Sequence, residues 1–276
     1  MLDNVLLLSA SAGAGHVRAA QALEHAFRDL NAARNVQHVD TLRYTTGVFR
    51  NLYSKAYIDM ANKAPEVLGW LYDHFDKPWR NERRRLAFDK LNTVRFVKML
   101  MKHRPDIVVC THFLPAEIIS YLRDERKVDF PQAVVVTDMD VHSMWLCRNV
   151  EHYYVALDET KEHLTRLGIP AGTVSVTGIP IDPVFNIPKD KQAMRQKYGL
   201  APDVWTILVS AGGFGVGPME HLMEALMQMQ RPAQVIAICG RNDDLRLRLQ
   251  QQAARATASP VRIHAIGYTT DMDEYM

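Results

Sequence analysis

Short apolar segments alternate with amphipathic segments along nearly the whole chain. The first apolar segment, residues 5–8, is followed after a loop by apolar residues at the three- and four-residue spacing of a helix. Further apolar segments predict strands at residues 36–40, 107–110 and 133–137, and later at 153–157 and 174–176. Apolar strands separated by helices are typical of a parallel sheet covered on both faces, which is an α/β fold. The apolar face of the first helix is predicted to consist of Ala19, Ala20, Leu23, Ala26, Phe27 and Leu30.

A proline-containing segment divides the chain. Residues 179–188 hold three prolines, which stiffen the backbone, and we interpret this segment as an interdomain linker. We therefore expect two Rossmann-like, doubly wound domains, the first over residues 1–178 and the second over residues 189–276. A doubly wound domain has about five or six strands, so we expect the second domain to be incomplete. Its predicted strands are residues 206–210, 234–239 and 261–266.

The composition is that of an ordinary globular protein, with 47% hydrophobic and 23% charged residues in 276. A formal net charge of +2 gives no indication of nucleic-acid binding. No apolar segment approaches the ~20 residues of a membrane span, and no signal-peptide pattern precedes the first strand, so we expect a cytoplasmic protein. The three cysteines are far apart, which favours reduced core residues over disulfides or metal ligands.

A loop of small residues, Ser-Ala-Ser-Ala-Gly-Ala-Gly-His at positions 9–16, joins the first strand to its helix. Small residues let a ligand approach the backbone, and the start of the following helix favours an anion. His16 falls in the first helical turn, where its ring can face a bound ligand. The loop matches a dinucleotide-binding fingerprint only in part, because Arg18 occupies the third glycine position. With Asp40 ending the next strand, a nicotinamide-dependent oxidoreductase is one alternative, and a tight structural turn is another.

A second loop, residues 211–218, contains four glycines between a predicted strand and a predicted helix. So many glycines indicate a close approach of phosphates to the backbone. No Gly-Lys-Ser/Thr follows, which excludes a Walker A loop.

Polar residues at positions 137–142 lie at the carboxyl end of the strand that begins at residue 133, at the edge where open α/β sheets place their chemistry. Asp138 and Asp140 could assist proton transfer or cap the next segment. His142 and Trp145 could shape an acceptor pocket or pack in the core. The spacing matches no dedicated metal motif.

Aromatic and basic side chains are interleaved over residues 48–102, which is typical of a protein resting on an anionic membrane surface. A solvated basic face is the alternative, because the region also predicts an apolar helical face that packs on the sheet. That face is Ala87, Leu91, Val94, Val97, Leu100 and Met101. The aromatic residues are Phe49, Tyr53, Tyr57, Trp70, Tyr72, Phe75, Trp79 and Phe88.

Four blocks in order, residues 9–16, 135–145, 177–181 and 210–215, resemble the monogalactosyldiacylglycerol synthase family. That family includes plant galactolipid synthases and bacterial processive diacylglycerol glucosyltransferases. It is related to the N-acetylglucosaminyltransferase that completes the peptidoglycan lipid precursor. The first block differs from the family pattern at one position, because Ala14 stands where many members have a third glycine. The resemblance implies a GT-B fold, in which two Rossmann-like domains face each other across a cleft.

The resemblance implies inverting, metal-independent transfer of a hexose from a UDP-sugar to a diacylglycerol-like lipid. The UDP-sugar is a co-substrate, and no other cofactor is implied. The implied setting is an anionic membrane surface, at the inner face of the plasma membrane. His16 is the implied general base, with Asp138 as its partner or substitute. Acceptor binding is expected at Gly13, Ala14, Gly15, His142 and Trp145. Donor binding is expected at Gly212, Gly213, Phe214, Gly215, Val216, Arg241, Asn242, Tyr268 and Thr269.

The family pattern continues with a further glycine-rich loop and an acidic residue that grips the nucleotide ribose. This sequence ends at Met276 before such a segment, so we expect a C-terminally truncated second domain. A non-catalytic lipid- or nucleotide-binding remnant is therefore a further alternative to the glycosyltransferase.

Overall fold

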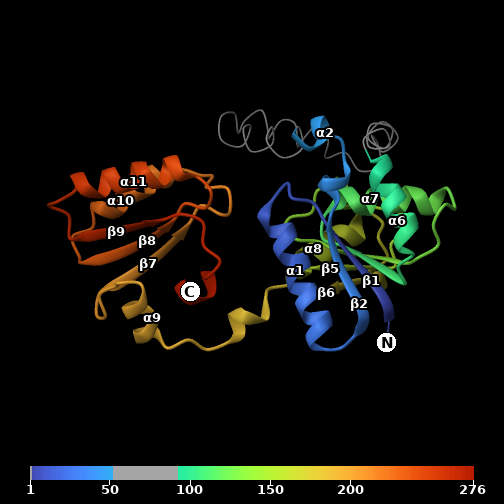
Figure 1. The fold of residues 1–276 in the computed structure, drawn as a ribbon, viewed down its shortest axis with the longest axis horizontal. Coiled ribbons are helices and arrows are strands. Elements are labelled where there is room, and N and C mark those ends of the chain that lie inside the picture. The colour runs from blue at the N-terminus through green and yellow to red at the C-terminus, as the bar shows by residue number, and fades with distance from the viewer. Residues whose placement is uncertain (1, 52–92) are drawn as a thin grey trace. The chain divides into compact units, whose positions relative to one another are not determined.

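The computed structural model describes residues 2–51 and 93–276, and the chain divides into two compact units (Figure 1). The units are Met1–Pro183 and Val184–Met276, so the division falls within the proline-containing segment 179–188. Each unit is built on its own parallel sheet. Most of the aromatic and basic side chains assigned to membrane contact lie between residues 52 and 92, outside the described residues, so that assignment stays a prediction.

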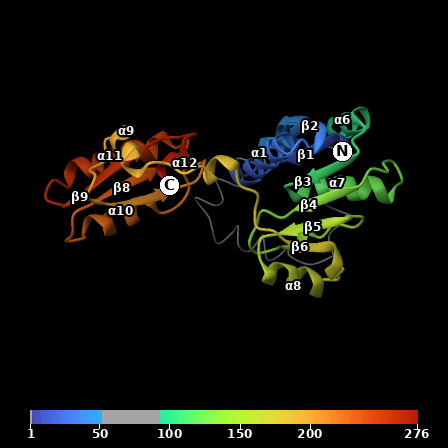
Figure 2. The same ribbon diagram turned by 90° about the horizontal axis from the view of Figure 1, so that it is seen from below.

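The first unit holds a six-stranded parallel sheet with the order β2-β1-β3-β4-β5-β6, visible along the sheet in Figure 2. From β1 the chain passes to β2 on one side and then to β3 on the other side of β1. The strand order therefore reverses between β1 and β3, and open α/β sheets bind ligands outside the carboxyl ends at such a point. The strands are β1 (Leu2–Ser9), β2 (Ala33–Asp40), β3 (Ile107–Cys110), β4 (Gln132–Val135), β5 (His152–Val155) and β6 (Val174–Val176).

Apolar side chains on both faces of this sheet are covered. Successive residues of a strand point to opposite faces, and all four residues from Val5 to Leu8 are at most 2% exposed. Val5 and Leu7 share a cluster with Leu23 and Phe27 of α1 (Ala14–Asp29). Leu6 and Leu8 belong to a larger core that includes residues of α6 (Val94–His103), α7 (Phe113–Asp124) and α8 (Asp158–Arg166). The predicted α/β class with covered faces is confirmed.

Two predicted helical faces were wrong in part. Leu30 is 77% exposed because α1 ends at Asp29, which leaves Leu30 as the C-cap beyond the packed face. In α6 the buried residues are Phe96, Met99 and Leu100, whereas Val94 and Met101 are exposed. Burial of the large Phe96 ring sets the rotation of this helix, and the predicted face did not include that residue.

The second unit holds a parallel sheet with the order β7-β8-β9, and its three strands fall where the sequence predicts them. Every residue of the central strand β8 is buried. Helices α10 and α11 lie on one face of the sheet (Figure 1), where Met223 and Leu249 pack in one cluster with Val235 and Ala237. The elements are α9 (Lys191–Lys197), β7 (Trp205–Ser210), α10 (Met219–Met227), β8 (Ala233–Ile238), α11 (Asp243–Arg255), β9 (Val261–Ile266) and α12 (Met272–Tyr275).

All three cysteines are free thiols buried in the two cores, Cys110 and Cys147 in the first unit and Cys239 in the second. Over residues 2–51 and 93–276, no helix combines the length and the apolar character that crossing a membrane requires.

Candidate active site

His16 lies beside the point where the strand order of the first sheet reverses. It is the third residue of α1, which follows directly from the loop after β1. Gly13 is the N-cap of this helix, and within the described part of the chain no side chain caps it. A helix start without a side-chain cap presents N–H groups and the positive end of the helix dipole to a ligand. A Cβ on Gly13 would lie 3.3 Å from Cδ2 of His16, so this glycine leaves room for the ring.

The imidazole of His16 is held through its Nδ1 atom. Nδ1 lies 3.1 Å from the carbonyl oxygen of Thr111 and 2.6 Å from Oγ1 of Thr137. These threonines follow β3 and β4 at the carboxyl edge of the sheet. Because a carbonyl oxygen can only accept, its contact favours a neutral ring that carries the proton on Nδ1 and leaves Nε2 unprotonated. The Thr111 hydroxyl also donates to the carbonyl of His16 over 2.8 Å, which fixes the backbone of the residue.

Burial lowers the pKa of His16 from its ordinary value of 6.5, because desolvation disfavours the charged imidazolium. The negative charge of Asp138 and the hydrogen bond to the Thr111 carbonyl act in the opposite direction, and His142 acts with burial. Because the pKa of His16 is lowered overall, the ring is neutral at pH 7. Its Nε2 atom is therefore in the form that accepts a proton.

A cluster of rings packs around His16. The His112 ring lies edge-on to it with the centroids 4.5 Å apart, and the Trp145 ring lies at 6.3 Å. His112 is 1% exposed and Trp145 is fully buried. The indole N–H of Trp145 donates to Oδ2 of Asp138 over 2.7 Å. Trp145, expected to bind the acceptor, thus has a supporting position from which it holds a neighbouring carboxylate.

Asp138 is engaged within its own loop. Its Oδ2 atom accepts the Trp145 bond and lies 3.5 Å from Nε2 of His142. Burial raises the pKa of Asp138, but the hydrogen bonds from His142 and Trp145 and the nearby His16 outweigh it, so the pKa is lowered from 3.8. Asp138 is therefore an ionised carboxylate of low basicity at neutral pH. The other predicted carboxylate of this loop, Asp140, is exposed.

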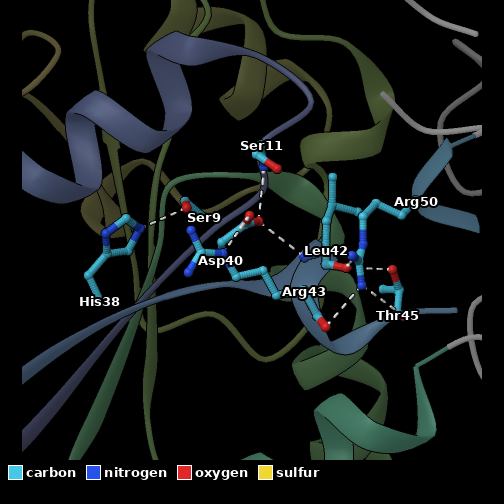
Figure 3. Close-up of polar contacts among 8 residues, drawn as sticks. All are labelled: Ser9, Ser11, His38, Asp40, Leu42, Arg43, Thr45 and Arg50. Carbon is cyan, nitrogen blue, oxygen red and sulfur yellow. Dashed lines mark hydrogen bonds and ion pairs between the residues drawn. The ribbon is translucent and has the colours of Figure 1, made fainter. Parts of the chain in front are cut away.

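Asp40 anchors the first loop to the end of β2 (Figure 3). Its Oδ1 atom accepts the N–H groups of Ser11 and Leu42, each over 3.1 Å, and Oδ2 lies 3.7 Å from Nε of Arg43. The carboxylate that a nicotinamide ribose would require is thus bound to the backbone of its own chain. Asp40, at the end of β2, therefore holds the loop that leads to His16.

In the second unit, the glycine-rich loop after β7 crosses the loop after β8 in backbone contact. Gly215 has φ +70°, and a Cβ there would lie 2.2 Å from the carbonyl oxygen of Cys239. Gly240 has φ +57°, and a Cβ there would lie 2.3 Å from the carbonyl oxygen of Gly212. Both positions combine a left-handed backbone with no space for a side chain, so each requires glycine.

Asn242 holds the two crossing loops together through hydrogen bonds. Its Nδ2 donates to the carbonyl of Gly215 over 3.0 Å, and its Oδ1 accepts the N–H of Leu245, which caps α11. The exposed guanidinium of Arg241 lies 5.1 Å from the ring centroid of Tyr268, which follows β9. The remaining expected donor residues of this edge are Gly212, which is exposed, and Gly213, Phe214, Val216 and Thr269, which are half-buried.

The structure gathers the expected residues into two groups, one at the carboxyl edge of each sheet. Thr111, His112 and Thr137 carry no predicted role in the sequence. Thr111 and His112 directly follow a predicted strand, so the strand-end signal that singled out Asp138 could have found them. In the part of the chain that the structure describes, no three His, Cys, Asp or Glu side chains are arranged to hold a metal ion.

Comparison with known proteins identifies relatives over the whole chain. The family described as monogalactosyldiacylglycerol (MGDG) synthase matches residues 16–181. A processive diacylglycerol beta-glucosyltransferase of Staphylococcus haemolyticus is 29% identical over 274 residues, covering 99% of this chain and 68% of that protein. The Staphylococcus aureus protein of the same name is also 29% identical, with the same coverage.

Solved structures show the same fold. Anabaena HepE in complex with UDP-glucose matches with a TM-score of 0.57 at 15% identity, covering 100% of this chain and 71% of that one. Acinetobacter baumannii MurG matches with a TM-score of 0.50 at 18% identity, covering 98% and 68%. The predicted GT-B fold class is thereby confirmed.

Gly215→Ala should destabilise the second unit more than Gly212→Ala. Both glycines have left-handed φ, which costs about 1–2 kcal/mol for a residue with a Cβ. Only Gly215 also places that Cβ against the Cys239 carbonyl, which adds about 1–3 kcal/mol of overpacking. Hydrogen exchange of the β8 amides in the two variants measures the difference. Equal protection in both would show that the loops do not cross in this way.

Acid should destabilise the protein partly through His112. Burial lowers the pKa of His112 well below 6.5, so as pH falls through 6.5 the unfolded chain takes up a proton that the folded chain refuses. The free energy of unfolding then falls, by up to about 1.4 kcal/mol per pH unit for one histidine. Asparagine keeps an oxygen that can cap α7, as Nδ1 of His112 does for the N–H of Leu114.

His112→Asn should therefore lose less stability than the wild type between pH 7 and pH 5. Urea unfolding followed by tryptophan fluorescence at both pH values gives the two losses. The other histidines are present in both proteins, so the difference between the two losses reports the change at position 112 and at its contacts with His16 and His142. Equal losses would mean that His112 does not titrate as a buried neutral ring.

Proposed function

Because this chain belongs to the monogalactosyldiacylglycerol synthase family, we propose that it transfers a hexose from a UDP-sugar to a diacylglycerol-like lipid, with inversion at the anomeric carbon. The observation that carries the proposal is the state of His16. Its Nδ1 lies within hydrogen-bonding distance of the Thr111 carbonyl and the Thr137 hydroxyl, and its lowered pKa keeps the ring neutral, which leaves Nε2 to take a proton. A lipid hydroxyl needs such a base when it attacks a sugar. The names of the Staphylococcus relatives and the UDP-glucose bound to HepE support the choice of substrates.

In this reaction the acceptor oxygen bonds to C1 of the sugar as the bond from C1 to the diphosphate oxygen breaks. The hydroxyl proton passes to Nε2 of His16, and UDP leaves with the electrons of the broken bond. The resulting imidazolium is stabilised by the Thr111 carbonyl and by the negative charge of Asp138. The low pKa of Asp138 favours this electrostatic role over that of the base.

The donor is assigned to the carboxyl edge of the second sheet. Helices α10 and α11 both begin there, and the positive ends of helix dipoles favour a diphosphate. Arg241 adds an exposed positive charge next to the aromatic ring of Tyr268. These groups can stabilise the leaving UDP, so we propose that no catalytic metal is needed.

The acceptor is a membrane lipid, so we propose that the protein acts at a membrane surface as a peripheral protein. Support comes from the described ends of the aromatic and basic region. Val48 of α2 (Gly47–Asn51) is 82% exposed, and Val94 and Met101 of α6 are also exposed. Exposed apolar side chains among basic ones favour an anionic lipid surface. Family membership and the backbone contacts of Asp40 leave the nicotinamide alternative without support.

His16→Ala should lower lipid-dependent UDP release about 10²–10⁴-fold, which is the usual contribution of a general base. The assay uses the full chain with UDP-glucose or UDP-galactose, liposomes that contain diacylglycerol, and EDTA. His25→Ala is the matched control, because His25 lies on the same helix and pairs with Asp182 at the surface. The control should keep the wild-type rate.

Release that survives His16→Ala would remove His16 from the role of base. Release that does not depend on the lipid would contradict the acceptor assignment. Binding of the wild type to liposomes without any turnover would favour the non-catalytic alternative.

A further inference from the structure

We propose that Thr137 is a positioning residue that fixes the Nδ1–H tautomer of His16 and so keeps Nε2 available as the base. The role of Nε2 as a base rests on the proposed function. The tautomer itself is a property of the folded chain and can be measured without any substrate.

Two oxygen atoms at the carboxyl edge of the first sheet lie within hydrogen-bonding distance of the Nδ1 atom of His16. Oγ1 of Thr137 lies 2.6 Å from it, closer than the Thr111 carbonyl oxygen at 3.1 Å, and the two oxygens are 3.4 Å apart. One arrangement of protons satisfies all three contacts. Nδ1–H donates to both oxygens, while the Thr137 hydroxyl donates its own proton to the Thr111 carbonyl.

The opposite tautomer leaves one contact repulsive. If Thr137 donated to an unprotonated Nδ1, the lone pair of that nitrogen would face the lone pairs of the Thr111 carbonyl at 3.1 Å. A buried polar pair of this kind costs free energy, because neither atom has a proton to share. The β-branched side chain of Thr137 has few rotamers, which helps to hold its hydroxyl in this place.

A carboxylate does not take this position, although Asp138 is the next residue in the chain. The hydrogen bonds of Asp138 go to Trp145 and His142. The ionisable groups that face His16 are His112 after β3, and Asp138 and His142 after β4. Of these, Asp138 favours the charged imidazolium and the histidines oppose it. Orientation by a hydroxyl and a carbonyl gives His16 a fixed tautomer without the strong rise in pKa that a bonded carboxylate would cause.

The test compares Thr137→Val, which keeps the shape but removes the hydroxyl, with Thr137→Ser, which keeps the hydroxyl. Nitrogen-15 NMR of the histidine-labelled full chain at neutral pH reports which ring nitrogen is protonated, and His16→Gln assigns the signals. We expect protonated Nδ1 and unprotonated Nε2 in the wild type and in Thr137→Ser. In Thr137→Val the two resonances should move toward each other as the second tautomer becomes populated. A wild-type ring protonated on Nε2, or an unchanged spectrum in Thr137→Val, would overturn the inference.

Kinetics give a second readout. In Thr137→Val, kcat should fall about 10- to 100-fold, by analogy with the loss of the partner that orients a metal-bound histidine, and Thr137→Ser should restore it. The acid limb of kcat/KM should move to lower pH in Thr137→Val, because the hydroxyl oxygen stabilises the imidazolium. A limb that moves to higher pH would show that Thr137 donates to Nδ1 and would overturn the inference. If even the wild type transfers no sugar, the proposed function fails, and the NMR comparison still decides the role of Thr137.

Discussion

The hydrogen bond between Nδ1 of His16 and the Thr111 carbonyl joins two segments that are 95 residues apart in the chain. It exists because β1 and β3 are neighbours in the sheet, so that the loops after both strands open at the same edge. The carbonyl can only accept, so together with the Thr137 hydroxyl it favours the proton on Nδ1. Burial decides that the ring is neutral. The tautomer, the charge and the direction of this one side chain thus follow from the strand order, and the chemistry that we propose depends on all three.

The two units present their ligand-facing edges by different physical means. In the first unit, side chains form the edge, because an imidazole, a hydroxyl and a carboxylate are held by one another and by the backbone. In the second unit, the backbone forms the edge, because Gly215 and Gly240 let two loops cross at a separation that leaves no space for a Cβ. This difference suits the two tasks that we propose, because a proton acceptor needs a titratable group and a diphosphate needs many N–H donors.

Periodicity in the sequence predicted most strands to within a few residues, as well as the two glycine-rich loops. Such patterns are local, and burial of apolar residues leaves a direct record in them. Contacts between segments far apart in the chain leave no such local pattern in the sequence. Thr111 and Thr137 could not be connected to His16 without the pairing of β1, β3 and β4. Asp40 looked like a ribose ligand at the end of a strand, but its partners are the backbone N–H groups of Ser11 and Leu42. Trp145 looked like part of an acceptor pocket, and its complete burial is a tertiary property.

The stereochemistry of the product tests the central claim most directly. In UDP-glucose and UDP-galactose the sugar is α-linked, so a single displacement by a lipid oxygen activated at Nε2 of His16 must give a β-linked hexosyl lipid. Proton NMR of the lipid extracted after reaction of the full chain with diacylglycerol liposomes reports the anomeric configuration. We expect the large anomeric coupling of a β-glycoside. An α-linked product would contradict single displacement with His16 as the base, and a liposome fraction without any hexosyl lipid would contradict the transferase itself.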